Sequence, residues 1–153
     1  KDYLEIQRIR YGNHIDFALT FDERLHNALV PSLLLQTFVE NTIKHGFSFQ
    51  DGIVINLSLQ KRIVDEKPYI EICVKDNGPG FSREILSKLK NMESLISEDG
   101  HHIGITNAIE RLNLLYSNDY TITFENNDTS GARIDVLVPY KELKGDSNEY
   151  TTR

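Results

Sequence analysis

Three polar side chains, Asn41, Lys44 and His45, are spaced so that they could act on one ligand. They stand at positions i, i+3 and i+4 within the stretch 33–46, whose apolar residues recur at helical spacing, so they would lie side by side on one helix face. An amide oxygen suits Mg²⁺, which usually also binds substrate phosphates, and an ammonium suits a phosphate oxygen. Taken alone, such a polar face is more often an ordinary solvated surface.

An acid at the end of a predicted strand, Asp76, is a second candidate. Its carboxylate could accept a hydrogen bond from an exocyclic amine such as that of adenine, whereas the O6 of guanine would be repelled there. Gly78 and Gly80 follow, and glycines permit close approach of the backbone. The dipeptides alone favour an ordinary Asn-Gly and Pro-Gly turn, but a turn does not require an acid directly after a buried strand.

A third segment, 100–107, runs from a glycine-containing loop directly into a predicted helix. The free N–H groups and the positive dipole end at a helix start suit phosphate. His101 and His102 could contact phosphate or simply be exposed. Each of the three segments is a weak signal by itself, but in this order they predict a nucleotide site.

Hydrophobic periodicity predicts the elements that position these residues. Helices are expected from Pro31 to Gly46, from Ser82, and from Ile103 to about Ser117, and a short helix over 2–11 is expected to continue one that begins upstream. Alternating apolar residues predict strands at 15–21, 53–60, 70–75, 120–124 and 132–138. The fold class is therefore α/β: a two-layer sandwich with a mixed, mostly antiparallel sheet of about five strands and three helices on one face.

The helix that carries Asn41 is predicted in more detail. Pro31 fits its first turn and Gly46 its C-terminal cap. Its packing face is expected to consist of Leu35, Phe38, Val39 and Ile43. Further along the chain, a turn is expected near Asp65 to Pro68 and a mobile loop between Asn91 and His102.

Composition limits the class of protein. The chain has 153 residues, the size of one domain, and its net charge of −6 argues against a nucleic-acid surface, which requires concentrated Lys and Arg. The single cysteine, Cys73, excludes an internal disulfide and is consistent with a reducing compartment. The histidines lack a second ligand pair at zinc spacing. No membrane span is expected, and the start at Lys1 suggests a piece of a longer protein.

These segments resemble the motifs of a known family. Residues 40–46 resemble the N box, residues 76–80 the G1 box, and residues 102–107 with 110–112 the G2 box of the ATP-binding domain of sensor histidine kinases of the LytS/YesM type. This family belongs to the GHKL superfamily of gyrase, heat-shock chaperone, histidine kinase and MutL proteins. The resemblance covers nearly the whole chain and implies the Bergerat ATP-binding fold.

The resemblance also implies roles for the candidate residues. Asn41 would ligate Mg²⁺, Lys44 and His45 would face the phosphates of ATP, and Asp76 would bind the adenine amine. Gly78 and Gly80 would shape the adenine pocket, and 100–104 would form the hinge of a lid. The full set implied to bind ATP is Asn41, Lys44, His45, Asp76, Gly78, Gly80, Gly100, His102, Ile103, Gly104, Ile105 and Asn107, with Asn41, Lys44 and His45 as the catalytic group.

Partners and domain limits follow from the same resemblance. Residues 1–13 would end a helix from an upstream dimerisation domain, 14–140 would form the ATP-binding catalytic domain, and 141–153 would be a polar tail. The γ-phosphoryl of Mg·ATP would pass to a histidine on that upstream domain and then to a cognate response regulator. The full protein would be a homodimer whose catalytic domain is cytoplasmic and belongs to a bacterial membrane sensor.

Three positions depart from the family pattern. Thr37 stands where related ATPases carry a water-activating Glu, so intrinsic hydrolysis should be poor. His102 replaces a frequent Gly, and Ala132 replaces a Thr that often helps to hold adenine, so that a water would take its place. Two alternatives therefore stay open: an ATPase switch of the gyrase or chaperone kind, and a non-catalytic nucleotide-binding or docking module.

Overall fold

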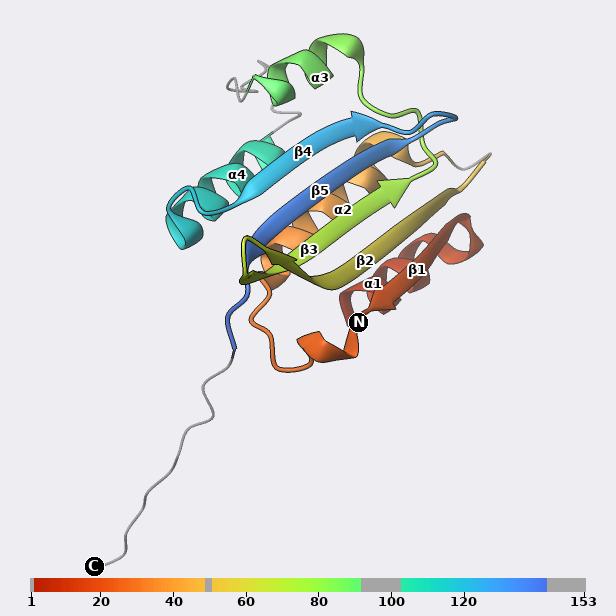
Figure 1. Ribbon diagram of the computed structural model, residues 1–153. Coiled ribbons are helices and arrows are strands. Elements are labelled where there is room, and N and C mark those ends of the chain that lie inside the picture. The colour runs from red at the N-terminus through yellow and green to blue at the C-terminus, as the bar shows by residue number, and fades with distance from the viewer. Residues whose placement is uncertain (1, 49–50, 92–102, 143–153) are drawn as a thin grey trace, which may run out of the picture.

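A five-stranded mixed sheet forms one layer of the molecule (Figure 1). The computed structural model describes residues 2–48, 51–91 and 103–142. The strands are β1 (Ile15–Phe21), β2 (Ile53–Val64), β3 (Lys67–Asp76), β4 (Thr121–Asn126) and β5 (Ala132–Pro139). Their spatial order is β1-β2-β3-β5-β4, and only the β1–β2 pair is parallel. The mixed, mostly antiparallel sheet is therefore confirmed.

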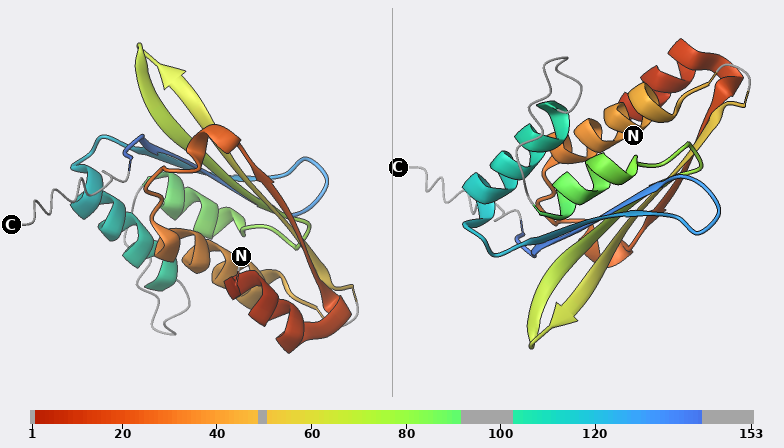
Figure 2. Two further views of the ribbon diagram at one scale, coloured as in Figure 1. Left: turned by 90° about the horizontal axis from the view of Figure 1, so that it is seen from below. Right: turned by 90° about the horizontal axis from the view of Figure 1, so that it is seen from above.

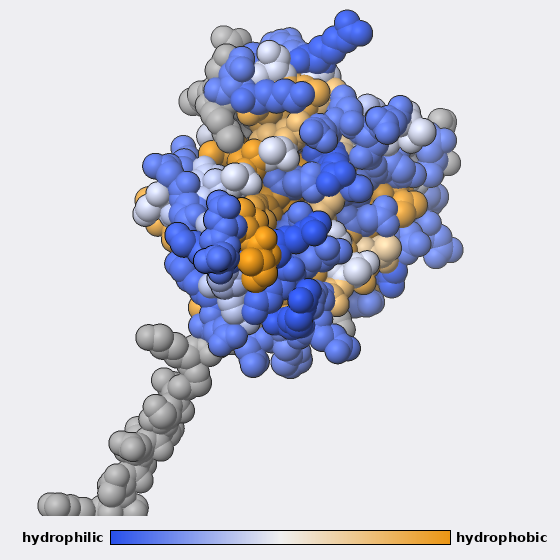
Figure 3. All heavy atoms as spheres, viewed as in Figure 1, coloured by the Kyte–Doolittle hydropathy of each residue, from blue (hydrophilic) through white to orange (hydrophobic). Residues whose placement is uncertain are grey.

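Helices form the second layer and cover one face of the sheet (Figure 2). They are α1 (Asp2–Tyr11), α2 (Ser32–Gly46), α3 (Arg83–Lys90) and α4 (Ile103–Tyr116), with short 3₁₀ turns at Gly12–His14 and Glu23–Leu25. The two-layer α/β sandwich is confirmed, although α1 adds a fourth helix to the three that were expected on that face. The opposite face of the sheet, seen in Figure 3, is mostly hydrophilic. None of the described helices is long and apolar enough to cross a membrane.

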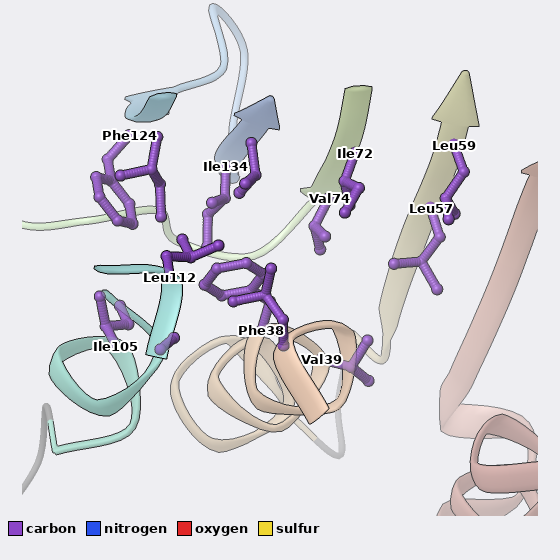
Figure 4. Packing of buried hydrophobic residues seen from close by; sticks show 14 of the residues in the cluster. Phe38, Val39, Leu57, Leu59, Ile72, Val74, Ile105, Leu112, Phe124 and Ile134 are labelled. Atoms are coloured by element: carbon purple, nitrogen blue, oxygen red, sulfur yellow. The ribbon is translucent and has the colours of Figure 1, made fainter. Parts of the chain in front are cut away.

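The core lies between the two layers. Alternate residues of the central strands point to the helices, so that Ile55, Ile72 and Val136 are almost fully buried. Figure 4 shows Phe38 directed from α2 toward the sheet. On α2 the four residues of the expected face, Leu35, Phe38, Val39 and Ile43, all pack against or within the core, but Leu35 is only partly buried, and Leu34, which was not expected there, is almost fully buried.

Both ends of α2 differ slightly from the prediction. Pro31 is the N-cap rather than a first-turn residue, and Gly46 is the last helical residue, with Phe47 as the C-cap. A Cβ at position 46 would lie 2.6 Å from Cδ1 of Ile53. Close packing against β2 and against the loop that follows β3 therefore explains this glycine better than a left-handed cap does.

The β2–β3 hairpin is longer than predicted. Its strands run on to Val64 and begin again at Lys67, with Asp65 and Glu66 at φ 48° and 65° in a two-residue turn. The end of the hairpin projects beyond the core, where both faces of the strands meet water, so the apolar alternation that marks a strand is lost there. Ser82 caps α3 through a hydrogen bond to the N–H of Ile85, as its position indicated.

Helix α1 packs against β1 and α2. The hydroxyl of Tyr3 donates to Oε1 of Glu40 at 3.3 Å, and Nη2 of Arg8 donates to Oδ1 of Asp16 at 2.9 Å. At the far end of α1, the ring of Tyr11 lies 5.0 Å from that of Phe47, centroid to centroid. Helix α1 therefore touches α2 near both ends, while its continuation into an upstream dimerisation domain stays a prediction. The predicted tail falls mostly outside the described residues.

Candidate functional site

A cavity of about 260 Å³ lies between α2, α4 and the loop that follows β3. We call it the Asp76 cavity. It is lined by, among others, Asn41, Thr42, Asp76, Phe81, Ile105 and Ile134. Its walls are mainly apolar, and Asp76 is 8% exposed. A flat apolar ring with one polar edge would match such a lining.

The carboxylate of Asp76 is fixed by three donors. Oδ1 accepts hydrogen bonds from the N–H of Gly78 at 2.9 Å and from the N–H of Ala132 at 3.1 Å. Oδ2 accepts from Oγ1 of Thr42 at 3.3 Å. These donors compensate the burial of the carboxylate, which has no cationic partner among the described residues. Oδ1 already accepts two hydrogen bonds, but Oδ2 accepts only one, so an amine in the cavity could still donate to Oδ2.

Sequence reasoning missed two of these donors. Thr42 directly follows Asn41 on α2, but it points inward and is 8% exposed. Ala132 was noted only for the threonine that it lacks, whereas its backbone N–H holds the carboxylate. Helical periodicity could have placed Thr42 beside the apolar stripe, but no sequence signal distinguishes the N–H of Ala132.

The glycines around Asp76 let separate segments meet. Gly80 has φ +76°, and a Cβ there would lie 2.7 Å from Oδ1 of Asn126. Gly131 has φ +102°, and a Cβ there would overlap the carbonyl oxygen of Asp76. Neither position can take a larger residue without a shift of the backbone. Gly78 is less constrained and lies against Gly46 at the end of α2.

Two asparagines from the end of β4 hold the loop after β3. The side chain of Asn126 accepts from the N–H of Phe81 at 2.7 Å and donates to its carbonyl at 2.8 Å. Nδ2 of Asn127 donates to the carbonyl of Asp76 at 2.9 Å. These contacts join residues about 50 positions apart and set the shape of the Asp76 cavity. From the sequence alone, these residues were expected only to form a turn.

A second cavity, of about 360 Å³, lies between α2 and α4. We call it the α2–α4 cavity. Its polar lining consists of Thr37, Glu40, Asn41 and Lys44 from α2 and Asn107 and Arg111 from α4. Asn41 lines both cavities and so marks the point where they meet. Gly104 brings α4 close to this point, because a Cβ there would lie 3.2 Å from both terminal atoms of the Asn41 amide.

The amide of Asn41 has no hydrogen-bond partner within the described parts of the chain. Its Nδ2 is fully buried, which makes an unpartnered amide costly unless a ligand satisfies it. The described residues contain no cluster of three or more His, Cys, Asp or Glu that could hold a metal. The Nδ2 donor needs an acceptor such as a phosphate oxygen, and the amide oxygen could ligate a Mg²⁺ ion that arrives on phosphates, because such an ion needs only one or two protein oxygens.

The predicted site residues thus divide between two cavities. His45, Asp76, Gly80 and Ile105 line the Asp76 cavity. Lys44, Gly104 and Asn107 line the α2–α4 cavity. Lys44 and His45, which were expected to face the phosphates together, therefore line different cavities. Gly100 and His102 lie outside the described residues, and Ile103 opens α4.

Comparison with known proteins gives three kinds of match. The family model described as "Histidine kinase-, DNA gyrase B-, and HSP90-like ATPase" matches residues 27–142. The chain is 30% identical over 140 residues to the sensor histidine kinase YesM of Bacillus subtilis, and 31% identical over 140 residues to the sensor histidine kinase/phosphatase LytS of Staphylococcus aureus. These alignments cover 91% of this chain but only 22% and 23% of the relatives, so the chain spans less than a quarter of their length.

Solved structures show the same fold. The catalytic domain of the histidine kinase ThkA matches with a TM-score of 0.62 and 16% identity, over 89% of this chain and 84% of that one. Full-length ShkA in complex with AMPPNP matches with a TM-score of 0.62 and 17% identity, over 93% of this chain and 29% of that one. The sandwich of helices on a mixed sheet is therefore the fold of histidine kinase catalytic domains.

Proposed function

Because this chain belongs to the family of histidine kinase-, DNA gyrase B- and HSP90-like ATPases, we propose that it is the ATP-binding catalytic domain of a two-component sensor histidine kinase. In this proposal it holds Mg·ATP and presents the γ-phosphoryl group to a histidine on a separate, upstream domain. The observation that carries the proposal is the pair of joined cavities: a buried carboxylate in an apolar cavity, opening at Asn41 onto a cavity with two cationic side chains.

The Asp76 cavity is proposed to bind adenine. The exocyclic amine would donate to the fixed carboxylate of Asp76, and Ile105 and Ile134 would contact the ring faces. Guanine would place its O6 acceptor against the carboxylate, so it should be excluded. Thr42 and Ala132 hold the carboxylate in place before the ligand arrives, which lowers the cost of binding.

Asn41 and Lys44 are proposed to hold the phosphates. The amide oxygen of Asn41 would ligate Mg²⁺, and Lys44 would place a positive charge in the α2–α4 cavity. Bound Mg²⁺ would neutralise charge on the phosphate oxygens. The contribution of the chain is then position and charge, which is most of what phosphoryl transfer requires.

The acceptor is proposed to be a histidine and not water. A nitrogen lone pair would attack phosphorus, and the bond to the bridging oxygen would break to release ADP. Hydrolysis would need a base that activates water, and Thr37 is unsuited to that role because a hydroxyl does not take up a proton at neutral pH; in the structure it donates to the carbonyl of Leu33 at 2.8 Å. The retained γ-phosphoryl is thus available for the protein acceptor.

The setting of the domain is part of the proposal. We infer an upstream dimerisation domain that carries the acceptor, a homodimeric full-length protein and a response regulator as the next acceptor. The sensor histidine kinases to which the chain is similar come from bacteria. A cytoplasmic position below a bacterial membrane sensor is inferred from that similarity.

One assay tests the function. The chain is incubated with Mg·ATP labelled on the γ-phosphate, alone and joined to the segment that precedes it in the full protein. Acid-labile, base-stable label on histidine is expected only in the longer protein, with little free phosphate from either. Rapid release of free phosphate would instead indicate an ATPase switch, and binding without transfer or hydrolysis would indicate a nucleotide-binding module.

A further inference from the structure

We propose that Arg111 binds the terminal phosphate of ATP in the α2–α4 cavity and so makes the domain distinguish ATP from ADP. This inference rests on the proposed function, because it takes the nucleotide to lie across the two cavities. It adds a residue that the sequence motifs left without a role.

The position of Arg111 follows from the spacing along α4. Gly104, Asn107 and Arg111 stand at i, i+3 and i+7, so they share the helix face that borders α2. Gly104 contacts the amide of Asn41, where the two cavities meet. Arg111 lies seven residues after Gly104, which is about 10 Å along the axis of α4. If adenine lies beside Asp76, the phosphate that extends furthest past Asn41 is the terminal one.

The charges around the α2–α4 cavity favour an anion. Two cations, Lys44 and Arg111, and one anion, Glu40, line it. Oε1 of Glu40 already accepts hydrogen bonds from Tyr3 and from Nε2 of Gln36, the latter at 2.8 Å. Within the described residues, no ion pair joins Glu40 to either cation. The cavity therefore has an excess positive charge that its own side chains do not neutralise.

Arg111 also differs from most arginines of the domain. Four others form ion pairs with carboxylates: Arg8, Arg24, Arg62 and Arg133. Arg111 is exposed and makes neither a hydrogen bond nor an ion pair with any described residue. A guanidinium can donate two parallel hydrogen bonds to one phosphate, which an ammonium such as that of Lys44 cannot do.

The test compares ATP with ADP on the same variants. Mg·ATP and Mg·ADP are titrated by calorimetry into the chain and into Arg111→Gln, Arg111→Lys and Arg62→Gln. Arg62→Gln is the matched control, because it removes the same charge from the β2–β3 hairpin, roughly 23 Å along the strand from the residue that pairs with Asp76. Circular dichroism and thermal unfolding monitor the fold of each variant.

We expect Arg111→Gln to weaken ATP binding by about tenfold to a hundredfold and to change ADP binding by less than about twofold. Arg111→Lys should lose part of this discrimination, since it keeps the charge but not the planar donor pair, and it decides the question if Arg111→Gln unfolds. Arg62→Gln should bind both nucleotides as the unmodified chain does.

Two results would overturn the assignment of Arg111. One is an equal loss of ATP and ADP affinity, which would place the side chain at the inner phosphates or in the structure of α4. The other is unchanged ATP affinity in a folded Arg111→Gln variant. Failure of the unmodified chain to bind either nucleotide would be a different result, since it would reject the proposed function itself.

Discussion

The two cavities share Asn41 but satisfy their polar groups in opposite ways. In the Asp76 cavity, both oxygens of the key carboxylate already accept hydrogen bonds, and the remaining walls are mainly apolar. In the α2–α4 cavity, neither Lys44 nor Arg111 pairs with a described residue, and the amide of Asn41 has no partner there either. In the folded chain, the polar groups of the Asp76 cavity therefore have hydrogen-bond partners, whereas those of the α2–α4 cavity named here do not.

This difference matches what each part of a nucleotide requires. A neutral base is recognised by shape and by a few directed hydrogen bonds, so the groups that recognise it are best fixed beforehand. A polyanion is bound by charge, and cations that paired with nearby carboxylates would have to give up those pairs first. The net charge of −6 strengthens the point, because the excess positive charge of the α2–α4 cavity is local.

Asp76→Ala should have the largest effect on ligand affinity, because it removes the central carboxylate of the Asp76 cavity. It removes the acceptor for the ligand amine and leaves the N–H groups of Gly78 and Ala132 without their partner. Affinity for both ATP and adenosine should fall by about tenfold to a hundredfold, since a charge-assisted hydrogen bond contributes roughly 1.5–3 kcal/mol. Calorimetry measures both ligands, with Asp119→Ala, an exposed acid before β4, as the control. Unchanged adenosine affinity would contradict the assigned role of this cavity.

Asn41→Ala should affect ligand binding in the α2–α4 cavity but not in the Asp76 cavity. Adenosine, which has no phosphates, should bind with affinity within about twofold of the unmodified chain, whereas Mg²⁺-dependent binding of ATP should weaken by about tenfold. The free energy of unfolding should change little, because the substitution also removes a buried donor that has no partner. Calorimetry with ATP in Mg²⁺ and in excess chelator measures the effect. A parallel loss of adenosine and ATP binding would refute the division of roles.

Thr42→Val tests how far the carboxylate must be fixed beforehand. The change keeps the shape of the side chain but removes the donor to Oδ2 of Asp76, a contact of 3.3 Å. The acceptor is a carboxylate, but the contact is long, so we expect it to contribute only about 0.5–1 kcal/mol and adenosine and ATP each to bind about twofold to fivefold more weakly. Thr123→Val on β4, an exposed position away from both cavities, is the matched control. If the variant bound more tightly, the hydroxyl would be competing with the ligand for Asp76.

The sequence predicted the fold and the groups that define each cavity. Alternating strands and helical periodicity predicted the sandwich, and position at a strand end and on a polar helix face selected Asp76 and Asn41. It could not say that Leu34, at the edge of the helical stripe, would be buried more deeply than Leu35 near its centre. Periodicity defines a face, but the crossing angle of neighbouring elements decides which residue at the edge of that face is covered.

What the sequence missed depends on contacts between distant segments. Asn126 and Asn127 stand in what looked like a plain turn, yet they hold the loop that carries Gly80. Arg111 lies in the segment 110–112 that resembles part of the G2 box, but the sequence indicated no role for it. Its distinction is that it faces α2 across a cavity and has no partner in the described chain, and neither property can be inferred before the two helices are placed side by side.

Tyr3→Phe should have the smallest effect and should leave both cavities able to bind. It removes the hydrogen bond from α1 to Glu40, which is exposed, so the free energy of unfolding should fall by a few tenths to about 1 kcal/mol at neutral pH. Burial, together with the charge and hydrogen bond of Glu40, raises the pKa of Tyr3 to about 12, against about 10 in an unfolded chain. A raised pKa favours the protonated side chain, so this contribution is complete below pH 10 and is lost as the pH rises toward 12. Urea unfolding of the two proteins at pH 8 and pH 11 should therefore show a gap that narrows at the higher pH, and a gap that stayed constant would mean that Tyr3 does not anchor α1 through its hydroxyl.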